Sequence, residues 1–238
     1  MNVITGQYGN ETIALVQWAL NHKLDQLVVV NVETSWQAVG WDQRVLKAKQ
    51  WLDGNGVESH TIRPRQSFDQ SMREHHAMPD SQNTWCAQHM IGDTLLDWLD
   101  EVDPMLQAHL YVGNRKALSK AWQTESFHQP KSEYFERRDL FQPLLDYDNQ
   151  KLIDLIAMTP LPYLSHQSLG CGPCIFSTSQ DLLALDPEDL LKVKQLEDDL
   201  GQTFHASQQT ILQTIEQAKQ GSLSSIGPSC RLPYGCRL

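Results

Sequence analysis

Basic residues are scarce in this sequence. The 238 residues include 19 Lys and Arg against 29 Asp and Glu, which gives a formal net charge of -10 at pH 7 and an isoelectric point near 5.3. Binding to nucleic-acid phosphates or to an anionic membrane requires clustered Lys and Arg. The charge balance therefore argues against a nucleic-acid partner, although it does not exclude a local basic patch.

Long apolar runs are absent as well. A membrane-spanning helix needs roughly 20 consecutive apolar residues, and no stretch of this chain approaches that length. Residues 1–4 lead directly into a folded pattern instead of a signal peptide. We therefore expect no membrane partner and a cytoplasmic location. The hydrophobic content of 40% and the mean hydropathy of -0.43 suffice for one main core with a small appended subdomain.

Cysteine is also infrequent, and the five cysteines lie in only three places: Cys86, the pair Cys171 and Cys174, and the tail residues Cys230 and Cys236. Thiolates at the spacing of the central pair can bind one metal, and one or two more complete a tetrahedral set. We therefore predict a 4Fe-4S cluster or a zinc ion at Cys86, Cys171 and Cys174, with Cys230 or Cys236 as the fourth ligand. Thiol–disulfide exchange and inert buried cysteines are the alternatives.

Strand-like and helix-like segments alternate along the first two thirds of the chain. Apolar runs predict strands at residues 3–4, 27–32, 57–62, 108–112 and, at the edge of the sheet, 140–145. Helical spacing of apolar residues predicts helices at residues 13–20, 41–51, 86–100 and 149–158. This order predicts an α/β fold, a parallel twisted sheet of about five strands with helices on both faces, and a ligand crevice at the carboxyl ends of the strands.

The last third of the chain has a different character. Residues 187–220 are charged, with an apolar stripe at helical spacing, and predict a helical hairpin packed on the sheet domain. The segment after Gly221 is rich in Ser, Gly and Pro, so we expect it to be ordered only through its cysteines. The sequence therefore divides into an α/β domain at residues 1–165 and a cysteine-containing helical region and tail at residues 166–238.

The segment after the first predicted strand has the composition of an anion site. Gly6 and Gly9 precede a helix, so backbone N–H groups would point outward at the positive end of the helix dipole. Thr12 could add a hydroxyl group. The alternative is an ordinary strand–helix turn capped by Asn10 or Thr12.

Two charged residues follow strands at the predicted crevice. Arg115 comes just after the fourth strand, where a guanidinium can bind phosphate or sulfate with two hydrogen bonds. Glu33 ends the second strand and could hydrogen-bond a ribose or an adenine. Arg137 and Arg138 could extend the same surface, although solvated arginines are the simpler interpretation.

Several short segments resemble known motifs and occur in the order of one family. Residues 9–12, Gly-Asn-Glu-Thr, stand where the family ends its Ser-Gly-Gly-Lys-Asp-Ser loop, and residues 32–35, Val-Glu-Thr-Ser, stand where it has Asp-Thr-Gly. Trp85-Cys86 matches an aromatic–cysteine element, residues 112–115 resemble Gly-x-Arg, and residues 141–144 resemble Tyr-x-Pro-Leu. The cysteine pair within residues 170–175 follows. The chain thus resembles the phosphoadenosine phosphosulfate (PAPS) reductase family of PP-loop ATP pyrophosphatases, with an adenine nucleotide alpha-hydrolase-like fold.

The resemblance implies an enzyme that binds ATP or PAPS for sulfur transfer, reduction or adenylation. It makes residues 1–165 the nucleotide-binding domain and implies magnesium with the nucleotide, a redox or sulfur-carrier protein as partner, and a homodimer. Catalytic residues stay unassigned. The residues that would bind the nucleotide are Gly6, Gly9, Asn10, Glu11, Thr12, Glu33 and Arg115.

The sequence departs from the family at the residues that act on phosphate. Asn10 stands in place of the loop lysine, Glu11 in place of the aspartate, and Gln7-Tyr8 in place of Ser-Gly. Without the lysine, a leaving pyrophosphate would be stabilised less. The Glu-Cys-Gly-His type of tail used by PAPS reductases is also missing. The alternative function is therefore a catalytically degenerate nucleotide-binding or interaction protein without pyrophosphatase activity.

Overall fold

The protein is built on one six-stranded, mostly parallel sheet, which confirms the predicted α/β class. The computed structural model describes residues 1–80, 83–118 and 122–223. The strands lie in the order β3-β2-β1-β4-β6-β5, and only β5 runs antiparallel to its neighbour. The strands are β1 (Asn2–Thr5), β2 (Leu27–Val32), β3 (Glu58–Ile62), β4 (His109–Tyr111), β5 (His128–Ser132) and β6 (Arg138–Phe141).

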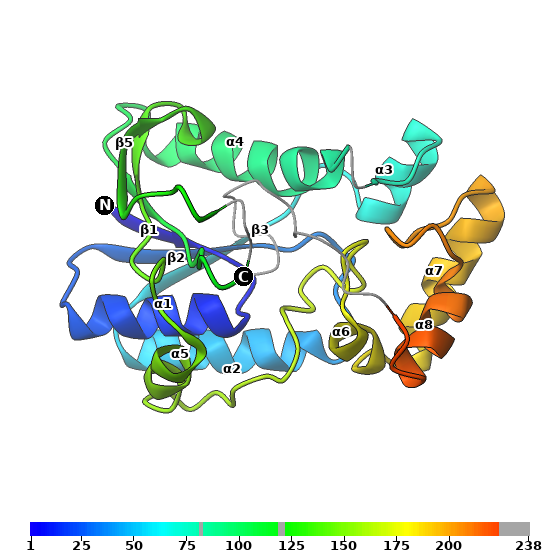
Figure 1. Ribbon diagram of the computed structural model, residues 1–238. Helices are drawn as coiled ribbons and strands as arrows, with labels where there is room; N and C mark the ends of the chain where they lie inside the picture. The colour runs from blue at the N-terminus through cyan, green and yellow to red at the C-terminus, as the bar shows by residue number, and fades with distance from the viewer. Residues whose placement is uncertain (81–82, 119–121, 224–238) are drawn as a thin grey trace.

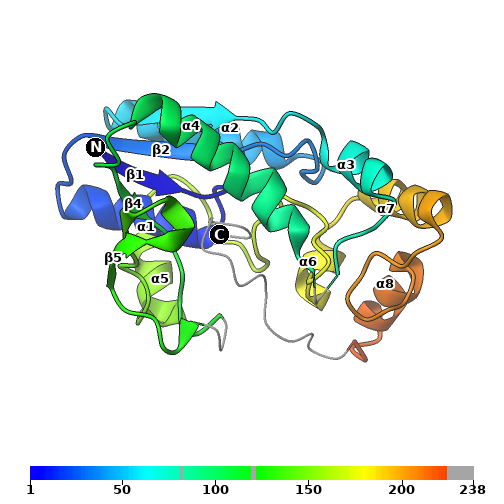
Figure 2. The ribbon, with the colours of Figure 1, turned by 90° about the horizontal axis from the view of Figure 1, so that it is seen from above.

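Helices cover both faces of the sheet, as Figures 1 and 2 show. One face packs against α1 (Asn10–Asn21), α2 (Trp41–Gly54) and α5 (Asn149–Ile156). The other face packs against α4 (Asp93–Val102), which continues the π-helical segment η1 (Ala87–Gly92). Alternate residues of β1 face the two cores, because Val3 belongs to one hydrophobic cluster and Ile4 to the other. The sheet is therefore buried on both sides.

The C-terminal helices extend the molecule beyond the carboxyl ends of the strands (Figure 1). They are α6 (Ser179–Leu183), α7 (Pro187–Leu200) and α8 (Ile211–Lys219), and α3 (Phe68–His75) lies at the same end of the molecule. Val193, Leu196 and Ile215 share the hydrophobic cluster of β1, β2 and α4. The two helices predicted within residues 187–220 are thus confirmed, and they pack against the hydrophobic cluster that the sheet shares with α4.

Local differences separate the predicted elements from the observed ones, and the short helix α6 is among the elements that were not predicted. The strand expected at residues 140–145 is β6, at Arg138–Phe141, and it is not at the edge of the sheet because β5 pairs beyond it. The sequence His-Gln-Pro-Lys-Ser of β5 lacks the apolar alternation of a strand. Helix α3 was missed because its sequence is mostly polar. Within the described residues, no helix is long and apolar enough to cross a membrane.

Candidate nucleotide site

The turn after β1, residues 6–9, leads directly into α1 and is closed to solvent. Gly9 is the N-cap of the helix, and no side chain caps the first turn within the described structure. Asn10 and Thr12 therefore do not act as the caps that the alternative interpretation required. Thr12 is fully buried, and its Oγ1 has no hydrogen-bond partner among the described residues. A Cβ atom at Gly6 would lie 2.1 Å from that oxygen, so residue 6 must be glycine.

Asn10 joins this turn to a distant segment of the chain. Its Nδ2 donates to the carbonyl of Leu164 at 2.9 Å, and its Oδ1 accepts from the Leu164 N–H at 2.9 Å. Ser168 also contacts the turn, because its Oγ donates to the carbonyl of Gln7 at 3.4 Å. Residues 162–170 therefore lie against the β1–α1 turn, and the residue that replaces the expected lysine fixes them there.

Glu11 and Arg115 meet in a buried ion pair. Arg115 Nη2 lies 2.9 Å from Glu11 Oε1, and the two side chains are only 3% and 5% exposed. Arg115 Nη1 donates to the Tyr147 carbonyl and to Asn149 Oδ1, at 3.3 and 3.0 Å. The structure therefore brings two predicted site residues together, with the guanidinium already engaged by protein acceptors.

Glu33 lines a separate pocket at the carboxyl end of β2, which we call the β2 pocket. Its volume is about 240 Å³. Glu33 Oε2 accepts from Arg63 Nη2 at 2.7 Å. The pocket is also lined by Asn31, Gln37, Trp41, Lys49 and Gly170.

Gly170 separates the β2 pocket from the β1–α1 turn. A Cβ atom at this position would lie 2.8 Å from Gln7 Cβ and 3.0 Å from Trp41 Nε1. Gln7 is 1% exposed and Trp41 6% exposed, yet the Gln7 amide and Trp41 Nε1 have no hydrogen-bond partners within the described residues. Buried polar groups are normally satisfied, so these atoms indicate a place where a ligand or ordered water supplies partners.

Arg44 of α2 is the functional candidate that the sequence did not reveal. Its Nε donates to the Tyr8 carbonyl at 2.7 Å and its Nη1 to the Pro162 carbonyl at 3.0 Å. Among the described residues it makes no ion pair, and its buried Nη2 has no partner. Burial lowers the pKa of Arg44 to about 10. An uncompensated guanidinium thus contacts the β1–α1 turn, where a bound anion would stabilise it.

No protein-family model matches the chain, and a search of curated proteins finds no match. Solved structures do resemble it. NMN synthetase from Francisella tularensis aligns with 96% of this chain and 87% of its own, at 12% identity and a TM-score of 0.50. The chain therefore has an α/β fold similar to that of this synthetase.

Two other solved structures have lower scores. Phosphoadenylyl-sulfate (PAPS) reductase from Candida auris aligns with 68% of this chain and 74% of its own, at 14% identity and a TM-score of 0.47. The tRNA thiolase NcsA from Methanococcus maripaludis, solved with its 4Fe-4S cluster, aligns with 96% of this chain and 74% of its own, at 14% identity and a TM-score of 0.49.

Three of the predicted metal ligands lie within the described part of the chain. Cys86, Cys171 and Cys174 are half-buried and pack against the same hydrophobic cluster. Cys174 Sγ accepts from the Phe176 N–H at 3.5 Å. Among residues 1–80, 83–118 and 122–223, no group of three or more His, Cys, Asp or Glu side chains is placed to hold a metal ion. Cys230 and Cys236 lie outside the described residues, so the predicted centre stays a prediction.

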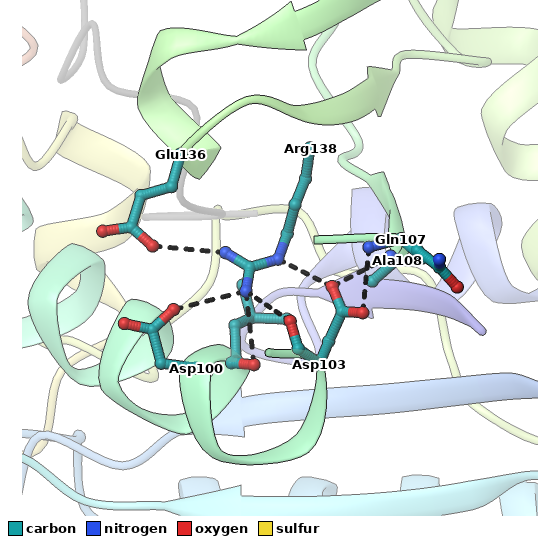
Figure 3. A network of polar contacts seen from close by, with 7 residues as sticks. Asp100, Asp103, Gln107, Ala108, Glu136 and Arg138 are labelled. Atoms are coloured by element: carbon teal, nitrogen blue, oxygen red, sulfur yellow. Dashed lines mark hydrogen bonds and ion pairs between the residues drawn. The ribbon is translucent and has the colours of Figure 1, made fainter. Parts of the chain in front are cut away.

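Arg138 does not extend the anion-binding surface. Figure 3 shows its guanidinium between α4 and β6, where it is fully buried and contacts Asp100, Asp103 and Glu136. Its Nε donates to Asp103 Oδ2 at 2.8 Å, and Asp103 also accepts from the N–H groups of Gln107 and Ala108. This network fixes the chain between α4 and β4, and it is structural.

Proposed function

We propose that the protein binds an adenine nucleotide, ATP or PAPS, with its base in the β2 pocket and its phosphates at the β1–α1 turn. The observation that carries the proposal is Arg44, a buried guanidinium without a carboxylate partner in the described chain, which contacts that turn. It supplies the positive charge that Asn10 does not. The N-terminus of α1 adds the favourable end of the helix dipole.

The unpartnered atoms beside Gly170 support the same placement. The Gln7 amide carries both a donor and an acceptor, and a glutamine amide can pair with the N6 amine and a ring nitrogen of adenine. Trp41 Nε1 and Gln37 Oε1 are likewise buried without partners in the described part of the chain. A purine edge in the β2 pocket would satisfy the Trp41 and Gln37 groups, which line that pocket.

The reaction we propose for such a complex is of the PAPS reductase type: sulfur transfer, reduction or adenylation. In this scheme Arg44 holds the phosphates, Lys49 and Glu33 lie at the edge of the β2 pocket, and magnesium accompanies the nucleotide. Gly6, Gly9 and Thr12 form the floor of the turn. A redox or sulfur-carrier protein would be the second partner, and a homodimer the assembly.

A second candidate function rests on Asn10 and Glu11. Both side chains that replace catalytic family residues are committed to protein contacts, Asn10 to Leu164 and Glu11 to Arg115. Under this alternative the protein binds the nucleotide without cleaving it and acts as a nucleotide-dependent interaction protein.

A 4Fe-4S cluster or a zinc ion is part of the first proposal only if the tail supplies a cysteine ligand. The three described cysteines do not by themselves form a metal site. A bound centre would need Cys230 or Cys236 to complete four thiolates with Cys86, Cys171 and Cys174. An iron–sulfur cluster would supply sulfur or redox chemistry beside the nucleotide, whereas zinc, which is not redox-active, would hold the tail against the rest of the chain.

Calorimetry with ATP and with PAPS tests the binding site. Arg44→Met keeps much of the aliphatic stem, and it should weaken nucleotide binding at least tenfold, which corresponds to about 1.4 kcal/mol. Arg44→Lys should be intermediate, since it keeps the charge without the planar fork. Arg65→Met, at an exposed arginine, is the matched control and should bind as the wild type does.

Two outcomes decide between the candidates. Release of pyrophosphate or reduction of PAPS by the wild type would support the enzyme, and binding without turnover would support the second candidate. If neither nucleotide binds the wild type, or if Arg44→Met binds normally while folded, the proposed site is wrong.

A further inference from the structure

A second pocket lies outside the proposed nucleotide site, and we call it the α3–α4 pocket. Its volume is about 410 Å³. Its walls are residues 64–66 after β3, one side of α3, Trp85, and residues of η1 and of the first two turns of α4. Figures 1 and 2 both show α3 beside the end of α4 at which that helix begins. Part of the wall is the π-helical segment η1, a conformation that often occurs at functional sites.

Three aromatic rings line this pocket. The Trp85 ring centroid lies 4.9 Å from that of His75 and 6.4 Å from that of His89. The two imidazoles are nearly parallel, at 14°, with centroids 6.2 Å apart. An indole face is electron-rich and attracts cations that lie over it. The pocket therefore has a wall suited to a flat or cationic group.

The pocket is also lined by negatively charged side chains. Asp93 and Asp97 line it from successive turns of α4. Like charges four residues apart destabilise an isolated helix, so their placement on one stripe favours a positive ligand. Asp93 already accepts from Gln88 at 2.6 Å and from His89 at 2.9 Å. Asp97 is the carboxylate with the fewest protein contacts in this wall.

Arg65 contacts Asp97 only weakly. Its Nη2 lies 3.4 Å from Asp97 Oδ2, and the two side chains are 92% and 64% exposed. Exposed ion pairs contribute about 0 to 1 kcal/mol. A guanidinium that entered the pocket itself would therefore compete with Arg65 successfully, because it would gain the Trp85 face together with the carboxylate.

We propose that the α3–α4 pocket binds a guanidinium group, stacked on Trp85 and hydrogen-bonded to Asp97, with Asp93 adding negative charge. A guanidinium suits this wall better than an ammonium, since it is planar, stacks on aromatic faces and pairs with a carboxylate through two N–H groups. The group belongs either to a free alkylguanidine or to an arginine side chain of a partner protein.

Calorimetry with agmatine tests the guanidinium site, and an arginine-containing tetrapeptide distinguishes the source. We expect agmatine to bind and putrescine, its diamine counterpart, to bind at least fivefold more weakly. Asp97→Asn should weaken agmatine binding at least tenfold, and Trp85→Ala should do the same. Glu101→Gln removes the same charge one turn further along α4, outside the pocket lining, and should leave the affinity unchanged.

Arg65→Ala gives the sharpest result, because the proposal predicts a gain. Removing the competing cation should tighten agmatine binding threefold or more. If the pocket instead bound anions, loss of the Arg65 charge would weaken ligand binding. A peptide that binds tenfold tighter than agmatine identifies a protein partner, and the reverse order identifies a small molecule. The proposal is overturned if agmatine and peptide both fail to bind at millimolar concentration, if Asp97→Asn binds normally, or if Arg65→Ala weakens binding.

Discussion

Arg115 donates from Nε and Nη2 to the same carboxylate oxygen of Glu11, at 3.2 and 2.9 Å. Glu11 lies in the first turn of α1 and Arg115 follows β4, so the pair joins two segments that are 104 residues apart in the chain. Gly113 makes the approach feasible, because a Cβ atom there would lie 2.9 Å from Glu11 Cβ. The contact fixes the β1–α1 turn against the end of β4.

The first prediction concerns the stability of this pair. Glu11→Gln leaves a buried guanidinium without its carboxylate, so the free energy of unfolding should fall by about 3 to 5 kcal/mol. Urea unfolding measures the change. Glu33→Gln removes the partner of the exposed Arg63 and should cost less than about 1 kcal/mol. Equal effects of the two substitutions would contradict a structural role for the Glu11–Arg115 pair.

The second prediction concerns Gly9, the buried N-cap of α1. Gly9→Leu places a bulky side chain where phosphates would approach the helix, so adenine nucleotide binding should weaken at least tenfold, or about 1.4 kcal/mol. Calorimetry with ATP measures it. Gly54→Ala serves as the control, because a Cβ atom there has open space. Unchanged affinity in folded Gly9→Leu would rule out this turn as the phosphate site.

The third prediction is a pH dependence from Asp103. Burial raises the pKa of Asp103, but hydrogen bonds from Arg138 and from the N–H groups of Ala108 and Gln107 outweigh it, and the pKa is lowered overall. The carboxylate therefore stabilises the fold above its unfolded pKa, near 3.9, and this contribution disappears as the pH falls through the lower folded value.

Asp103→Asn should accordingly destabilise the protein by about 3 to 5 kcal/mol at pH 7 and by less at pH 3. Urea unfolding at the two pH values gives the comparison. Asp100 contacts the same guanidinium, but its side chain is 57% exposed. Asp100→Asn should therefore lower the free energy of unfolding by less than about 1 kcal/mol. If Asp103→Asn lowered the free energy of unfolding equally at both pH values, ionised Asp103 would not be the source of the pH dependence.

The fourth prediction concerns the cysteines. We expect anaerobically purified protein to hold one metal centre, with visible absorbance and stoichiometric sulfide for a 4Fe-4S cluster, or a colourless, sulfide-free protein for zinc. Because the described cysteines are not arranged as a site by themselves, Cys230→Ser combined with Cys236→Ser should abolish metal binding, as should Cys171→Ala. Metal-free wild-type protein would assign the cysteines to packing or thiol exchange.

Much of the fold could be predicted from the sequence, because buried strands and helices have characteristic patterns of apolar residues. The continuous apolar run at residues 27–32 became β2, which is buried along its whole length between two layers of helices. The alternation of such runs with amphipathic segments predicted the α/β class. Strand β5 was missed for the same reason, since an exposed edge strand with a proline carries no apolar pattern.

The sequence by itself therefore determined the five parallel strands, most of the helices and the glycine-containing turn that enters α1. Only the tertiary structure decided which charges meet. Arg44 looks like a solvated helix residue until Tyr8 and Pro162 enclose it. The pairing of Arg115, which was predicted to bind phosphate, with Glu11 is likewise visible only in the folded chain. Hydrophobic periodicity is a property of neighbours along the chain, whereas the environment of a buried charge depends on segments that the strand order brings together.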